Sequence, residues 1–265
     1  MATPGTTPST PNAFADYVRS QSAVSVELPL VHTTECRHLP SIQVSHTLEP
    51  QNCPVFGEPL LYFFYGRPSY RDPFKSRPIT NVAYCPICFV FKPQRPFAIH
   101  RIFPFDSGAS QRGLYEPEIS RSHALTKYPV SAAVQSARQI IRRFFDTNEN
   151  YLASRPSLGL AFSPGEVDAE AYYKLVTGGG SSNCDDRRSA IEVQIKDKID
   201  LREHLWAIVM PTDFLDDAPL RKTLIEEWRA HPLTYDADLG MRPTEFHGNV
   251  RAMIRKYYKE VWRLI

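Results

Sequence analysis

The sequence predicts a mixed α+β fold with its β structure concentrated in the first half. Short runs rich in Val, Ile, Phe and Tyr recur between prolines in that half, whereas apolar residues at helical spacing mark the middle and the end of the chain. The 23 prolines against 12 glycines favour many short elements separated by rigid turns. We therefore expect no doubly wound parallel sheet.

The length of 265 residues is close to the upper limit for a single hydrophobic core, so we expect one domain over residues 12–265. Residues 1–11 are rich in Thr and Pro and predict a disordered tail. The formal net charge of +2 gives no reason to expect an obligate nucleic-acid partner. Without an apolar run of membrane-spanning length or a signal-peptide pattern, we expect a cytoplasmic protein with no membrane partner.

The elements of the first half are expected in this order. Asn12 can cap a short helix, and residues 23–30 form a strand that ends close to His32. A short helix or turn covers residues 39–48, and the continuous apolar run at residues 59–65 predicts a buried strand.

The rest of the chain continues this pattern. Further expected strands, rich in β-branched and aromatic residues, cover residues 81–91, 98–105, 190–195 and 205–210. Apolar residues at steps of three and four predict amphipathic helices at residues 131–145 and 246–264, the second with a basic side. Between these elements, residues 178–186 predict a flexible polar loop rich in glycine.

The five cysteines form no even framework and are expected to be reduced thiols. Cys85 and Cys88 form a CxxC pair, which is half of a typical zinc site. Because no second CxxC and no spaced His pair follows, we expect two thiols in a strand and no metal.

Three separated segments carry side chains suited to chemistry. They are His32-Thr33-Thr34, Tyr65-Gly66-Arg67-Pro68 at the end of the next strand, and Glu192 in a late strand behind the glycine-rich loop. In this order they resemble the ADP-ribosyltransferase superfamily, in which a His or Arg on the first strand precedes an aromatic residue on the next and a Glu on a late strand. The likeness is greatest to the DarT-type DNA ADP-ribosyltransferases.

The resemblance implies a split β-sheet core with flanking helices, and NAD as co-substrate. It implies a mono-ADP-ribosyltransferase that cleaves the nicotinamide glycosidic bond and passes ADP-ribose to a nucleic-acid or protein acceptor. A toxin or defence effector, with an antitoxin or another regulator as partner, would fit the same resemblance. Glu192 would be the catalytic carboxylate that stabilises an oxocarbenium-like transition state, and Arg67 would support the phosphates or that transition state.

The remaining roles implied by the resemblance concern NAD binding. His32 would bind the adenosine ribose, the Thr33 backbone would hold the nicotinamide amide, and Tyr65 or Tyr70 would stack on the ring. Thr34 would be a further NAD-binding residue. Two departures matter. Thr33 stands where one branch of the superfamily has Gly. Arginine-directed members carry an acidic residue two positions before the catalytic Glu, where this chain has Ala190, and this disfavours arginine as the acceptor.

Other interpretations stay open. An NAD glycohydrolase would use the same Glu192 with water as acceptor, and a non-enzymatic binding module would use the basic C-terminal helix. The RNA 2′-phosphotransferase branch shares the fold and also uses NAD, but it relies on further basic residues that we could not align with this chain. Alternation along residues 190–195 leaves open whether Glu192 borders solvent or a cleft, and the tyrosine that meets nicotinamide could be Tyr62, Tyr65 or Tyr70.

Overall fold

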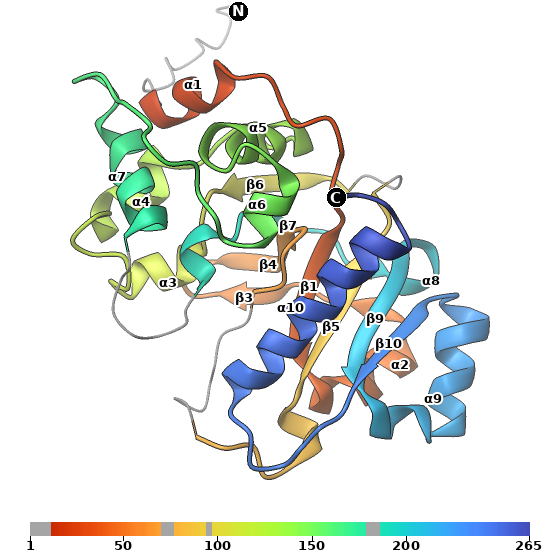
Figure 1. Ribbon diagram of the computed structural model, residues 1–265. Helices are drawn as coiled ribbons and strands as arrows, with labels where there is room; N and C mark the ends of the chain where they lie inside the picture. Colours follow the sequence, from red (N-terminus) through yellow and green to blue (C-terminus); the bar gives the residue numbers. More distant parts are fainter. Residues whose placement is uncertain (1–11, 70–76, 94–96, 179–185) are drawn as a thin grey trace, which may run out of the picture.

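One large mixed β-sheet organises the chain, for which the computed structural model describes residues 12–69, 77–93, 97–178 and 186–265. Helices flank this sheet, so the expectation of a mixed α+β fold is confirmed (Figure 1). Adjacent strands run antiparallel except for one parallel pair at an edge. In spatial order the strands are β10 (His231–Tyr235), β9 (Leu205–Pro211), β5 (Pro86–Phe91), β1 (Leu30–Glu35), β4 (Glu58–Tyr65), β7 (Glu192–Ile195) and β6 (Ile99–Phe103), and β3 (Gln51–Cys53) pairs with β4.

The two central strands, β1 and β4, stay together over a short distance only. Their described pairing consists of Leu30 with Tyr65 and Val31 with Phe64. Beyond this point β1 continues along β5 as far as Glu35, while β4 pairs on its other side with β7. The sheet therefore parts between β1 and β4, next to His32.

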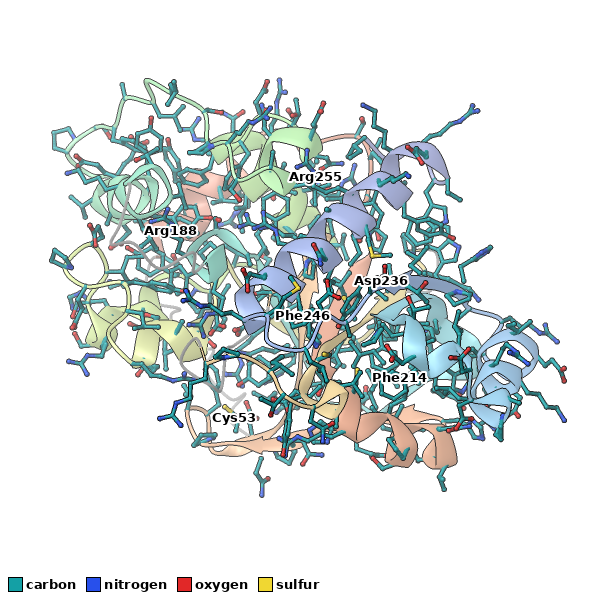
Figure 2. The ribbon with its side chains drawn as sticks, turned by 60° about the horizontal axis from the view of Figure 1, so that its bottom comes forward. Cys53, Arg188, Phe214, Asp236, Phe246 and Arg255 are labelled. Carbon is teal, nitrogen blue, oxygen red and sulfur yellow. The ribbon has the colours of Figure 1, made fainter. Side chains whose placement is uncertain are left out.

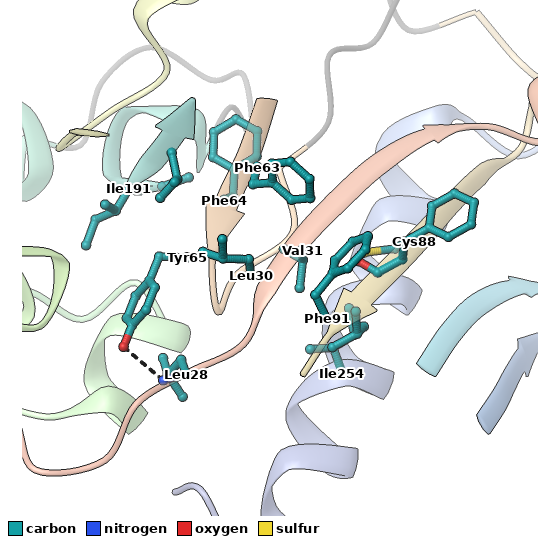
Figure 3. Packing of buried hydrophobic residues seen from close by; sticks show 14 of the residues in the cluster. Leu28, Leu30, Val31, Phe63, Phe64, Tyr65, Cys88, Phe91, Ile191 and Ile254 are labelled. Carbon is teal, nitrogen blue, oxygen red and sulfur yellow. Dashed lines mark hydrogen bonds between the residues drawn. The ribbon is translucent and has the colours of Figure 1, made fainter. Parts of the chain in front are cut away.

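The C-terminal helix, α10 (Pro243–Glu260), crosses one face of the sheet over β5 and β9 (Figure 1). Phe246 and Arg255 both lie along this helix (Figure 2). Phe246, Val250, Ile254 and Tyr258 are buried in the hydrophobic core, and Figure 3 shows Ile254 on this helix among the buried residues of that core. The predicted amphipathic helix is confirmed, although it ends at Glu260, and its apolar stripe is part of the core.

The other helices form two groups (Figure 1). Near β6 and β7 lie α1 (Ala13–Arg19), α3 (Ser107–Gln111), α4 (Arg121–Lys127), α5 (Val134–Phe144), α6 (Asn148–Leu152) and α7 (Val167–Thr177). Toward β9 and β10 lie α2 (Leu39–Ser45), α8 (Leu201–His204) and α9 (Ala218–Lys222), and the short strands β2 (Thr47–Leu48) and β8 (Ile199–Asp200) pair with each other. Phe14 joins the first group, because its ring packs on those of Phe144 and Tyr172.

The prediction of a strand at residues 23–30 is wrong, because regular strand pairing begins only at Leu30. Helical side chains bind this backbone instead of a neighbouring strand. Arg138 donates from Nε to the carbonyl of Val24 at 2.8 Å, and Asn148 donates to the carbonyl of Val26 at 3.0 Å. Since its polar groups are satisfied in this way, the segment needs no sheet partner despite its β-branched residues. His32 consequently lies in the middle of β1 rather than just beyond a strand.

Candidate active site

The carboxylate of Glu192 is buried at the centre of one half of the sheet. Glu192 stands on β7 between Phe64 of β4 and Phe103 of β6, and the residue is 1% exposed. The backbone N–H of Ser107 donates to its Oε2 at 2.9 Å, and the Ser107 hydroxyl donates to its Oε1 at 2.7 Å. Gln194 Nε2 donates to the same Oε1 at 2.7 Å. Three donors therefore fix the carboxylate in one orientation.

These donors reach Glu192 through local structure. Asp106 caps α3 by accepting from the N–H of Ala109 at 2.7 Å, which turns the first N–H of that helix, on Ser107, toward the carboxylate. Gln194 follows Glu192 by two residues on the same strand and so shares its face of the sheet. Its Oε1 is buried and has no hydrogen-bond partner among the described residues. The cluster thus contains an acceptor that a ligand hydroxyl could satisfy.

The environment of Glu192 favours its protonated form. Burial, together with the nearby carboxylate of Asp106, raises the pKa of Glu192 to about 8 despite the hydrogen bonds from Ser107 and Gln194. A carboxyl group that is both desolvated and held by donors is characteristic of functional sites.

This shift predicts how stability depends on pH. Folded Glu192 binds a proton up to a pH of about 8, whereas the ordinary value for the unfolded chain is 4.5. Between these values the folded state holds more protons, so the free energy of unfolding should fall as pH rises, by at most about 1.4 kcal/mol per pH unit for one proton. Urea unfolding of wild type and Glu192→Gln at pH 5, 6.5 and 8 measures this, because the variant should lack that part of the slope. Parallel pH profiles would contradict it.

His32 lies where β1 and β4 separate. Its Nδ1 donates to the carbonyl of Tyr62 at 2.8 Å, and its ring lies near Phe63 with a centroid distance of 5.6 Å. Burial lowers the pKa of His32, so the imidazole is neutral at pH 7. Since Nδ1 carries the proton for the carbonyl, Nε2 is the acceptor of this ring.

A cavity of about 640 Å³ adjoins this point, between β1, α2, β3 and β4. Its polar lining includes His32, Thr34, Ser41, Asn52, Cys53 and Tyr62. Among the described residues that line it there is no Lys or Arg, and the single carboxylate belongs to Glu49. The cavity therefore suits a neutral group with several hydroxyls or amides more than a phosphate.

Tyr62 connects the cavity with the face that carries Glu192. It lines the cavity, and it stands opposite Gln194 across the β4–β7 pair. Its hydroxyl donates to Sγ of Cys53, another lining residue, at 2.7 Å. Glu192 is then a diagonal cross-strand neighbour of Tyr62, a spacing of about 7 to 8 Å. Of the two predicted tyrosines within the described residues, Tyr62 and Tyr65, it is Tyr62 that shares the Glu192 face.

Tyr65 and Thr33 lie elsewhere. Tyr65 is 1% exposed, and its hydroxyl accepts a hydrogen bond from the N–H of Leu28 at 2.9 Å, as the dashed line in Figure 3 marks. The hydroxyl of Thr33 points at Cys88 of β5, with 3.6 Å between Oγ1 and Sγ. Neither residue lines the cavity, and Tyr70 lies outside the described residues.

Arg67 is buried beside the Tyr65–Gly66 turn. Gly66 has φ +68°, and a Cβ there would lie 2.5 Å from Leu28 Cδ1, so only Gly fits this turn. Arg67 follows with 1% exposure, and its Nη1 donates to Ser189 Oγ at 2.9 Å and to the carbonyl of Tyr151 at 3.4 Å. These contacts tie the end of β4 to α6 and to the segment before β7. We expected Arg67 to support the phosphates or the transition state, whereas its described contacts are with the protein interior.

Arg101 and Ser107 were not singled out from the sequence. Arg101 of β6 stands opposite Gln194 on the Glu192 face. For Ser107 a local signal existed, because Asp-Ser before a short helix is a common capping sequence. Arg101 had no such signal, since only the sheet register brings it to Gln194.

Comparison of the chain with protein-family models, curated proteins and solved structures found no match. Over the described ranges, no set of three His, Cys, Asp or Glu side chains is grouped so that it could hold a metal ion. In the same residues, no helix has the length and apolar character required to cross a membrane.

Proposed function

We propose that this protein is an NAD-dependent mono-ADP-ribosyltransferase, which breaks the nicotinamide glycosidic bond and transfers ADP-ribose to a nucleic-acid or protein acceptor. The observation that carries the proposal is the buried, hydrogen-bonded carboxylate of Glu192 one strand away from Tyr62 and the cavity. The order β1, β4 and β7 makes the strands of His32, Tyr62 and Glu192 consecutive neighbours. This arrangement supports the likeness to the superfamily that the sequence suggested.

The chemistry requires a fixed negative charge near the ribose. Cleavage of the N-glycosidic bond develops positive charge on the ribose ring, as in glycoside hydrolysis. A preorganised carboxylate in a desolvated position stabilises this charge more than water does. Ser107 and Gln194 would hold Glu192 in place, and Oε1 of Gln194, which has no partner in the described part of the chain, would accept from a ribose hydroxyl.

The cavity would take the nucleoside at the far end of NAD. The hydroxyl groups of Thr34 and Ser41 and the amide of Asn52 line the cavity and would form hydrogen bonds with the polar groups of the nucleoside. Neutral His32 offers Nε2 as an acceptor. Tyr62, at the boundary between the cavity and Glu192, replaces Tyr65 as the residue proposed to contact nicotinamide or its ribose.

A hydrolytic activity is the second candidate. Ala190 is fully buried and apolar two positions before Glu192, so this position supplies no acidic group to activate an acceptor side chain. The binding-module interpretation was based on the C-terminal helix. It loses this support, because the apolar stripe of α10 packs against the sheet.

Product analysis tests the proposal. The protein is incubated with NAD alone and with single-stranded DNA, RNA or protein, and nicotinamide and free ADP-ribose are quantified. Nicotinamide in excess of free ADP-ribose, with label on one acceptor, is the expected result. Equal amounts of the two products would indicate an NAD glycohydrolase, and no nicotinamide under any condition would refute both activities.

The rate should depend on pH through Glu192. Only the ionised carboxylate stabilises a developing cation, and its pKa is raised to about 8. Nicotinamide release at subsaturating NAD should therefore increase as pH rises from 6 to 8.5, by about tenfold per unit well below the pKa. Initial rates across this range measure it. A rate that falls over the range would contradict the assignment.

A further inference from the structure

A cluster of basic side chains surrounds one carboxylate at the edge of the Glu192 face. Arg101 forms an ion pair with Oε1 of Glu58, and Lys196 Nζ lies 2.6 Å from its Oε2. His100 Nε2 lies 3.2 Å from Oε1. Burial and the charge of Lys196 lower the pKa of His100, so the histidine is neutral at pH 7. The positive charges of Arg101 and Lys196 are thus both next to the single negative charge of Glu58.

Register places this cluster beside the candidate site. Arg101 stands opposite Gln194, and Gln194 stands opposite Tyr62, so the three form one row across β6, β7 and β4. With strands about 4.8 Å apart, the row spans about 10 Å. One end of the row is at the cavity wall, and Glu192 is the next residue on the same face of the middle strand.

The Arg101 guanidinium is held in position yet accessible. It lies over the ring of Phe56 at 4.1 Å from the centroid, and Glu58 fixes its other side. The side chains of Arg101 and Lys196 are 23% and 48% exposed. A planar guanidinium fixed on an aromatic ring is well suited to bidentate contact with phosphate oxygens.

We propose that Arg101 and Lys196 form a phosphate-binding subsite next to Glu192, and that Glu58 competes with the phosphate for both cations. The described cavity lining has no cation, so the diphosphate of a dinucleotide whose nucleoside fills the cavity needs one from outside it. Arg101 stands at the end of the row away from the cavity, but its guanidinium reaches back across β7 to Glu58 of β4, the strand that forms the cavity wall. The inference rests on the proposed function for this ligand, while a phosphodiester of a nucleic-acid acceptor would offer the same chemistry.

Equilibrium binding tests the subsite with three probes: inorganic pyrophosphate, ADP and a single-stranded thymidine oligonucleotide. Calorimetry compares wild type with Arg101→Gln and Glu58→Gln. Loss of a charge-assisted contact should weaken phosphate binding about tenfold in Arg101→Gln. Removal of the competing carboxylate should strengthen it several-fold in Glu58→Gln. Lys259→Gln, at an exposed position of α10, makes the same charge change as Arg101→Gln and should leave affinity for pyrophosphate and ADP unchanged.

The arms separate the sources of phosphate. If Arg101→Gln weakens and Glu58→Gln strengthens the binding of ADP and pyrophosphate but not of the oligonucleotide, the subsite binds the diphosphate of the dinucleotide. If the two variants change only the affinity for the oligonucleotide in these directions, the subsite binds the acceptor backbone. Thermal melting confirms that each variant is folded, and Lys196→Gln gives a second test, with weaker binding expected. Equal affinities of wild type, Arg101→Gln and Lys196→Gln, or no binding of any probe, would overturn the subsite. None of these readouts requires nicotinamide release, so an inactive protein that binds pyrophosphate through Arg101 would refute the function and keep the subsite.

Discussion

Replacing Glu192 by Gln is expected to reduce kcat for nicotinamide release by about 10² to 10³-fold, the effect typical of losing one preorganised electrostatic group. KM for NAD should change little, because the carboxylate acts on charge that exists only in the transition state. Gln has nearly the same shape and can still accept from Ser107, so the loss reports the missing charge. Steady-state rates of nicotinamide release measure both constants.

Glu35→Gln provides a control matched in residue type and burial. Glu35 is 7% exposed at the end of β1 and forms an ion pair with Arg37 at 2.5 Å. This variant should keep the wild-type rate, since Glu35 pairs in register with Pro86 at the opposite end of β1 from the contact with β4. If Glu192→Gln retained more than about a third of wild-type kcat, the carboxylate would have no part in the chemistry, and the proposed function would lose its main support.

The apolar patterns predicted the elements in which apolar residues form a continuous run or recur at helical spacing. The continuous run at residues 59–65 is β4, and the steps of three and four at residues 131–145 contain α5. The edge strand β10 was missed, because His231, Pro232 and Thr234 give it no alternating pattern. It forms a strand because the parallel partner β9 accepts it in register, which is a tertiary effect.

In the candidate site too, some features are indicated by the sequence and others depend on the tertiary fold. Glu192 could be selected from the sequence, but its donor Ser107 lies 85 positions earlier in the chain. Nothing local specifies that contact, which depends on the register of β6 against β7 and on the cap of α3. The choice between Tyr62 and Tyr65 was also beyond the sequence. They stand on opposite faces of β4, and a strand covered on both faces does not reveal which face borders a cavity.

Replacing Arg67 by Met is expected to lower the free energy of unfolding by about 3 kcal/mol. The substitution keeps an extended side chain but removes the donors to Ser189 and to the carbonyl of Tyr151, both in the interior. Tyr151 in turn donates to the carbonyl of Tyr65 and accepts from the N–H of Ile191, next to Glu192. Arg67 therefore supports the strand that carries the carboxylate rather than the substrate.

Arg142→Met is the matched control for this prediction, because Arg142 is 45% exposed and pairs with Asp146, just beyond the end of α5. Its loss should cost about 0.5 kcal/mol or less. Urea unfolding at constant pH gives both values, and nicotinamide release at a temperature where Arg67→Met is fully folded gives the rate. A structural role predicts a large loss of stability with most of kcat retained. A variant as stable as wild type but with kcat reduced about 100-fold would instead indicate that Arg67 stabilises the transition state. A group that acts only on the reacting atoms affects the rate and leaves the folding equilibrium unchanged.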